Sequence, residues 1–104
     1  MISRICHGYT TIENADAYEL LLEREIFKEI DSHNIEGYHG INLLRRELEN
    51  EVEFITIMWF ESMDDVRAFA GDDYEIAVVP PKARKLLKRF DEKSQHYNVK
   101  VKTY

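Results

Sequence analysis

Apolar residues fill six of the seven positions 54–60, within the stretch EFITIMWFES at 53–62. Successive side chains of a β-strand point to opposite faces, so a strand with one exposed face alternates apolar and polar residues. This stretch instead places apolar residues on both faces: Phe54, Met58 and Phe60 on one, and Ile55, Ile57 and Trp59 on the other. The pattern predicts a strand that is covered from both sides.

The residues before this strand predict another strand, an amphipathic helix and the first half of a hairpin. Residues 2–9 form a short apolar run of strand-favouring residues. Gly37 and Gly40 mark the end of the helix, and 38–62 reads as two strands joined by a polar turn at 49–51. The helix itself is indicated by apolar residues at three- and four-residue steps: Leu20, Leu21, Ile26, Phe27 and Ile30.

After the hairpin, the pattern predicts two further helices and a last strand. Ser62 is a good cap for a short helix that ends before Gly71. Residues 72–79 fit either a loop or a strand, and 95–104 alternate as a strand does. Two prolines favour the start of a helix at 80–90, whose apolar residues have helical spacing: Ala83, Leu86, Leu87 and Phe90.

The predicted element order is β-α-β-β-α-(α)-β, within a single domain of residues 1–104. Right-handed crossovers and the hairpin fold this order into a ferredoxin-like, four-stranded antiparallel sheet with helices on one face. No element remains to cover the other face. A second copy of the chain can cover it, with the two sheets packed about 10 Å apart. We therefore expect a dimeric α+β barrel, a face-to-face homodimer.

Composition and charge narrow the classes of protein further. A hydrophobic content of 44% suits a folded domain. No run approaches the roughly 18 apolar residues of a membrane-spanning helix, and the first ten residues lack the features of a signal peptide. The single cysteine, Cys6, fits a reducing compartment. The net charge of −6 argues against nucleic acid or an anionic membrane as partner. We expect a cytoplasmic protein.

The charge is distributed unevenly along the chain. Residues 1–81 hold 6 basic and 18 acidic side chains, a net charge of −12, whereas residues 82–104 hold 8 basic and 2 acidic side chains, a net charge of +6. The last quarter of the chain therefore either docks electrostatically, on its own chain or on a partner, or presents a solvated basic helix face.

The element order and two segments resemble antibiotic biosynthesis monooxygenase (ABM) domains. The segments are Gly37-Tyr38, after the first helix, and IMWFESMDDVRAF at 57–69. The resemblance covers nearly the whole chain and implies a dimeric α+β barrel with a pocket between sheet and helices in each subunit. Members of this family include cofactor-free oxygenases of polyketide phenols, haem-degrading oxygenases, and quinol or signalling-pathway enzymes. Many other members have no known activity.

The residues at the family's polyketide-oxygenase site differ from the pattern. The resemblance implies a Trp two residues before Ser62, an Asn four residues before that Trp, and a Tyr within the helix. Those places hold Phe60, Thr56 and Val66. A shift of one residue brings Trp59 into the Trp place but leaves Ile55 in the Asn place.

The haem-degrading pattern is also broken. The resemblance implies a Trp in the second helix and a His about ten residues later, where this chain has Phe69 and Val79. The Asn expected in the first strand falls near Cys6 and His7. The resemblance therefore indicates a fold more firmly than a reaction.

Three residues are candidates for acid–base chemistry. A neutral His7 in the first strand could accept a phenolic proton, or it could be a hydrogen-bonded core or rim residue. Pairing of the first and last strands would bring His96 near His7. Two histidines without a thiolate or carboxylate at a clear spacing do not indicate a metal site. Tyr74 lies where a lid over the pocket would be, or is a surface aromatic. Cys6 is expected to be a buried, inert thiol.

Four further residues are candidates for substrate binding. Trp59, Phe60 and Phe69 could contact an aromatic ligand, although Trp59 could equally pack in the core or at a dimer interface. Arg84 could attract an anionic ligand or belong to a solvated helix face.

Two functions follow as hypotheses. Nucleotide-binding, hydrolase and zinc-protease motifs are absent from the sequence. The first hypothesis is a cofactor-independent monooxygenase of a small aromatic or quinol-type substrate, which itself supplies the electrons to O₂. The second is a non-catalytic dimeric barrel that binds a hydrophobic or haem-like ligand.

Overall fold

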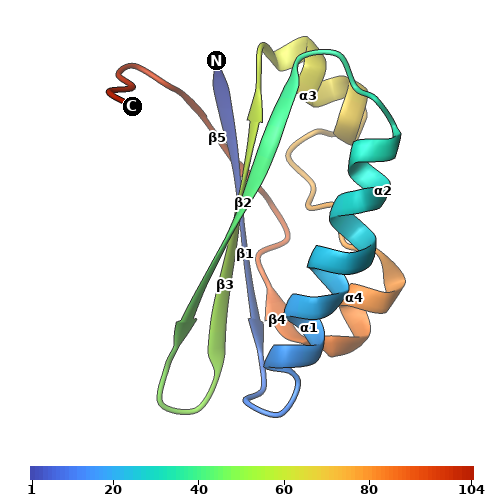
Figure 1. The fold of residues 1–104 in the computed structure, drawn as a ribbon, viewed down its shortest axis with the longest axis vertical. Coiled ribbons are helices and arrows are strands. Elements are labelled where there is room, and N and C mark those ends of the chain that lie inside the picture. Colours follow the sequence, from blue (N-terminus) through green and yellow to red (C-terminus); the bar gives the residue numbers. More distant parts are fainter.

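All the helices lie on one face of a single sheet in the computed structural model, which describes residues 1–104 (Figure 1). The strands are β1 (Ile2–Thr10), β2 (Tyr38–Glu47), β3 (Val52–Phe60), β4 (Leu87–Phe90) and β5 (Gln95–Asn98). The helices are α1 (Ala15–Leu21), α2 (Phe27–Ser32), α3 (Met63–Ala70) and α4 (Pro81–Leu86), with a π-helical turn, η1 (Leu22–Ile26), between α1 and α2. The predicted α+β class and helix-on-one-face arrangement are confirmed.

The sheet is antiparallel, with β1 near its centre. The strand order is β2-β3-β1-β4, and β5 also pairs with β1. Along the same edge of β1, β4 pairs with residues 8–10 and β5 with residues 2–5. The outer position beside β1, for which a single strand at 95–104 is predicted, is therefore filled by two short strands, with an interruption at residues 91–94.

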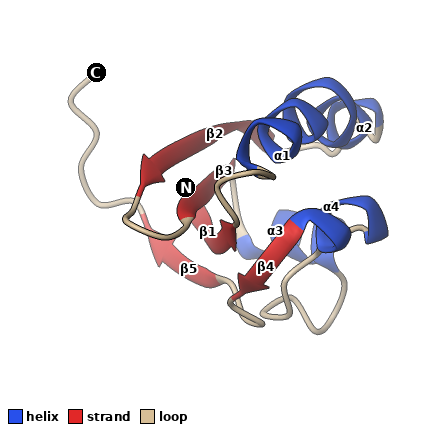
Figure 2. Ribbon diagram, turned by 90° about the horizontal axis from the view of Figure 1, so that it is seen from below, coloured by secondary structure: helices blue, strands red, loops and turns tan.

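The C-terminal quarter differs from the prediction in two places. The helix predicted for residues 80–90 ends at Leu86, because Leu87 has an extended backbone (φ −79°, ψ 135°) and residues 87–90 pair with β1. At residues 87–90, hydrogen bonding to β1 thus determines the structure, although the apolar spacing is that of a helix. The last strand ends at Asn98 rather than Tyr104, and the tail after it leaves the body of the protein (Figures 1 and 2).

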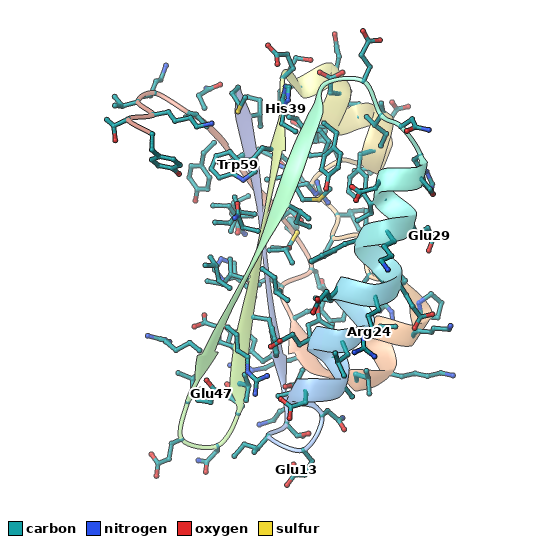
Figure 3. All side chains as sticks on the ribbon, viewed as in Figure 1. Glu13, Arg24, Glu29, His39, Glu47 and Trp59 are labelled. Atoms are coloured by element: carbon teal, nitrogen blue, oxygen red, sulfur yellow. The ribbon has the colours of Figure 1, made fainter.

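The two faces of β3 have different surroundings. Phe54, Met58 and Phe60 point toward the helices and are buried, at 0–3% exposure. Ile55, Ile57 and Trp59 point away from them and are only half-buried; Figure 3 shows Trp59 on the side opposite to the helices. The helices thus cover one face of this strand, as predicted, and no element of this chain covers the other (Figure 2). We call that second surface the open face.

Local signals explain how α3 is placed against the sheet. The Ser62 hydroxyl accepts a hydrogen bond from the Asp65 backbone N–H, as an N-cap does, and donates one to the Asp65 carboxylate. Gly71 follows the helix with φ +88°, a value that favours glycine. α3 then packs Val66 and Phe69 toward β3.

Part of the basic C-terminal quarter pairs with acidic residues of its own chain. Lys82 contacts Glu25 at 3.0 Å, and Lys88 and Arg89 contact Glu51 at 3.3 and 2.6 Å. These ion pairs are exposed, so each contributes little to stability. No helix of this structure is both long and apolar enough to span a membrane.

Candidate functional site

A narrow cavity of about 80 Å³ lies between the inner face of the sheet and the helices. Of its 22 lining residues, 16 are hydrophobic, so the cavity suits an apolar or aromatic ligand better than a polar one. Its walls come from β1 to β4, from the helices and from the segment before α4; they include Cys6, Tyr18, Leu22, Phe54, Met58, Phe69 and Val79.

The cavity is smaller than an aromatic ligand requires, because a benzene-sized site needs about 150 Å³. One wall, formed by residues 77–80, contains neither helix nor strand. Such segments move at lower free-energy cost than packed strands or helices do. We therefore expect this wall to move when a ring-sized ligand enters.

Arg4 is a charged residue on the inner face of the sheet. It lines the cavity and is completely buried, with 0% of its surface exposed. Its Nη1 donates to the backbone carbonyl of Tyr74, and its Nη2 donates to that of Ile76 at 3.2 Å. Its guanidinium carbon lies 5.6 Å from the centre of the Phe69 ring. Burial lowers the pKa of Arg4, while the neighbouring Cys6 side chain opposes that shift.

His96 contacts the same Arg4 nitrogen that donates to the Tyr74 carbonyl. The distance from Arg4 Nη1 to His96 Nε2 is 2.9 Å. A guanidinium can only donate, so Nε2 must be the acceptor and the ring proton must lie on Nδ1. Burial, followed by the charge of Arg4, lowers the pKa of His96, and Glu75 partly opposes this. His96 is therefore neutral at pH 7.

The segment around Tyr74 closes this end of the site. The Ser94 backbone N–H donates to the Glu75 carbonyl at 2.6 Å, and Ala77 N–H donates to the Glu92 carbonyl at 2.8 Å. The Cys6 sulfur lies 2.8 Å from the Ser94 hydroxyl. Backbone pairing therefore ties the residues after α3 to the interruption between β4 and β5, directly over β1.

The structure brings some of the predicted site residues together. The rings of Tyr74 and His96 meet edge to face, with centroids 5.2 Å apart. Phe69 lines the cavity, and the fully buried Phe60 packs against it with centroids 5.9 Å apart. Tyr74, His96, Phe69 and Phe60 thus lie on the helix side of the sheet. Cys6, expected to be buried, is half-buried, and its sulfur contacts the Ser94 hydroxyl.

Other predicted residues lie elsewhere. The register pairs His7 with Ile55, which puts the imidazole on the open face, 4.0 Å from Glu53, although His7 is also among the residues that line the cavity. The expectation that His96 lies near His7 is wrong, because His96 pairs with Arg4 and points to the opposite face. Trp59 is also on the open face, where its Nε1 donates to Asn42 Oδ1 at 2.7 Å.

Arg84 lies on α4 and is not among the residues that line the cavity. Its guanidinium carbon is 5.0 Å from the centre of the Phe90 ring, which does line it. This contact supports Phe90 from outside.

Arg4 is the site residue that sequence reasoning missed. A usable signal was present, because alternation in the first strand places Arg4 on the same face as Ile2 and Cys6. A charged residue in the middle of an inward face is a departure from the core pattern, and such departures point to functional sites.

Comparison with known proteins supports the architecture. A crystal structure of a Bacillus cereus protein, provisionally assigned as an antibiotic biosynthesis monooxygenase, superposes with a TM-score of 0.68 over 99% of this chain and 96% of that chain. The fold is ABM-like. The two sequences are 12% identical, so the likeness concerns the fold. No protein-family model and no curated protein matches the sequence.

Proposed function

We propose that the protein is a cofactor-independent monooxygenase of a small aromatic or quinol-type substrate, bound in the helix-side cavity. The observation that supports this proposal most is a mostly apolar cavity within an ABM-like fold, with Arg4 as part of the wall that the sheet forms. Apolar walls exclude water, and positioned groups can hold an electron-rich ring next to O₂. The Bacillus cereus protein of the same fold is provisionally assigned a monooxygenase activity, which supports the same reaction class.

The proposed reaction needs no external reductant. In a substrate of the anthrone type, a methylene carbon loses two hydrogens and gains a double bond to oxygen. One atom of O₂ enters the product, and the other leaves as water with those two hydrogens. The substrate thus supplies all four electrons. The protein's contribution is to bind the ring, to favour its ionised form and to exclude water.

We do not assign His7 a role in this site: it is among the residues that line the cavity, but alternation in β1 turns its imidazole to the open face. It stays a candidate base only for a ligand held against that face. In the cavity, burial raises the pKa of Tyr18 to about 12, so this hydroxyl stays protonated at pH 7.

The proposal includes a homodimer through the open face. The apolar and half-buried residues of that face lie on three adjacent strands, with Leu44 on β2 beside Ile55 on β3, and Ile5 on β1 beside Ile57. Monomers rarely leave such a contiguous apolar area in water. A second copy, packed sheet to sheet, would cover it.

Oxygen uptake tests the proposal directly. Purified protein is mixed with anthrone-type and quinol-type compounds, and oxygen consumption is compared with that of the compound alone. We expect protein-dependent uptake, with one labelled oxygen atom per product molecule when labelled O₂ is supplied. Tight binding of these compounds without added oxygen uptake would contradict the proposal and favour the non-catalytic, ligand-binding barrel.

A further inference from the structure

The Arg4 guanidinium is a buried cation for which the chain supplies no anion. Arginine stays charged in proteins, and a buried charge is costly unless a counter-charge accompanies it. No carboxylate makes an ion pair with Arg4; its partners are two backbone carbonyls and the neutral ring of His96. Arg4 Nε, moreover, is buried and has no hydrogen-bond partner.

This cation is also a wall of the cavity. Arg4 lines it beside Cys6, Met58 and Phe69, none of which carries a negative charge when the thiol is protonated. Asp91 is the one acidic residue among those that line the cavity, and it is exposed and follows the end of β4. The position beside Arg4 is therefore positive and lacks an acceptor.

We propose that Arg4 is the binding site for an ionised aromatic hydroxyl, so that the ligand of this cavity is a phenolate whose oxygen accepts from the guanidinium. The proposal rests on the function proposed above and adds the chemical class of the ligand. The ring lies among the apolar walls, and the oxygen supplies the missing counter-charge. The ionised form is also the one that gives electrons to O₂ most readily, so the binding site selects the reactive form.

A coloured phenol makes the proposal testable without any turnover. Para-nitrophenol is yellow only when ionised, and para-nitroanisole is its methyl ether, which cannot ionise. An apolar cavity alone would raise the pKa of the bound phenol, whereas a guanidinium in contact would lower it by about one unit or more. The sign of the shift therefore decides between simple hydrophobic binding and binding at Arg4.

The titration is done on the wild-type protein, above the pH range in which His96 gains a proton. That imidazole, the Cys6 thiol, the Tyr74 hydroxyl and the Glu75 carboxylate are the other titratable groups around Arg4, and the Tyr18 hydroxyl and Asp91 belong to residues that line the same cavity. We expect the bound nitrophenol to be more yellow than free nitrophenol at the same pH, and to bind roughly tenfold or more tightly than nitroanisole. A raised pKa, equal affinities, or no binding of nitrophenol would overturn the proposal.

Two variants locate the effect. Arg4→Met should abolish the colour shift, whereas Arg24→Met removes one positive charge from an exposed helix position and should leave it unchanged. If Arg4→Met does not fold, the Arg4 Nε–H resonance of wild-type protein labelled in arginine, assigned by its absence in Arg4→Lys, should move when nitrophenol is added. A resonance that stays in place, or a colour shift that persists in Arg4→Met, would overturn the proposal.

The nitrophenol titration and the oxygen-uptake experiment can fail independently of each other. A lowered pKa of bound nitrophenol, without oxygen uptake on any anthrone or quinol, would support the phenolate site and contradict the monooxygenase. Oxygen uptake without the lowered pKa would do the reverse.

Discussion

His96 is where a single side chain should make stability depend on pH. Its pKa is lowered in the folded protein from the ordinary value of 6.5. Below pH 6.5 the unfolded chain takes up a proton that the folded chain does not, so the free energy of unfolding falls as the pH falls toward the folded pKa; above 6.5 this contribution is constant. We expect His96→Gln, which keeps an acceptor for Arg4 but cannot titrate, to lose less stability on acidification. Denaturant unfolding across this pH range measures the difference.

The control for this experiment is His33→Gln. His33 is exposed at the end of α2 and makes no side-chain contact with Arg4. It should follow the wild-type pH dependence. A His96→Gln profile that superposes on the wild type would mean that the Arg4–His96 contact does not control the protonation of the ring.

Phe69 and Val79 lead to a prediction about haem. Both line the cavity, at places where the ABM resemblance implies a Trp and a His in haem-degrading members. Without those side chains we expect no degradation of haem. With a reductant present, the haem absorbance should decay no faster than in the same buffer without protein. Faster bleaching with release of iron would contradict this prediction.

The residue scale also shows where sequence reasoning stopped. Tyr74 and His96 come from different elements, and their meeting depends on strand register, which a pattern does not reveal. The residue type of His7 makes it a candidate base, although alternation along β1 places its side chain on the face opposite to those of Arg4 and Cys6. For His7, the face of the strand on which the side chain lies is therefore more informative than the acid–base chemistry of its imidazole.

At the scale of elements, strong local signals were predicted well and competing ones were not. Ser62 and Gly71 bracket α3 as expected, because capping and positive φ are local requirements. Residues 87–90 satisfy both a helical apolar pattern and a strand, and pairing with β1 decided between them. Such a choice depends on a distant strand, so no local window contains it.

Substitutions at two glycines test how closely the residue before β2 packs against α3. Gly37 and Gly71 both have positive φ, +81° and +88°. A Cβ at Gly37 would overlap the Asp65 carboxylate that contacts Ser62, whereas a Cβ at Gly71 would meet nothing within 4 Å. We expect Gly71→Ala to cost about 1–3 kcal/mol from backbone strain alone, because its φ of +88° and ψ of −175° lie in a region that only glycine adopts readily. Gly37→Ala should cost more, by roughly 1 kcal/mol or above, since the clash adds to the strain. Chemical denaturation measures both, and equal costs would contradict the predicted clash.

At the scale of the whole molecule, one layer of the expected architecture is absent from the single chain. The sheet has helices on one face only, and residues of the open face such as Leu44 and Tyr97 are 45% and 55% exposed. The C-terminal tail adds further exposed apolar surface: it leaves the body of the protein (Figure 1), and its Val101 and Tyr104 are 79% and 94% exposed. Apolar area of this kind favours a second copy of the chain.

The open face gives a prediction about assembly. A stable sheet-to-sheet dimer should bury more than about 1,200 Å², so the protein should sediment at micromolar concentration with twice its chain mass of 12.4 kDa. Ile57 points out of the open face near its centre, and a carboxylate there would be buried without a partner in the dimer. Ile57→Asp should therefore yield monomer. Leu20→Asp puts the same charge on α1, at a residue that is 41% exposed, and should leave the dimer intact. A wild-type protein that sediments as a 12.4 kDa species would contradict the dimer, and a dimeric Ile57→Asp variant would move its interface away from the open face.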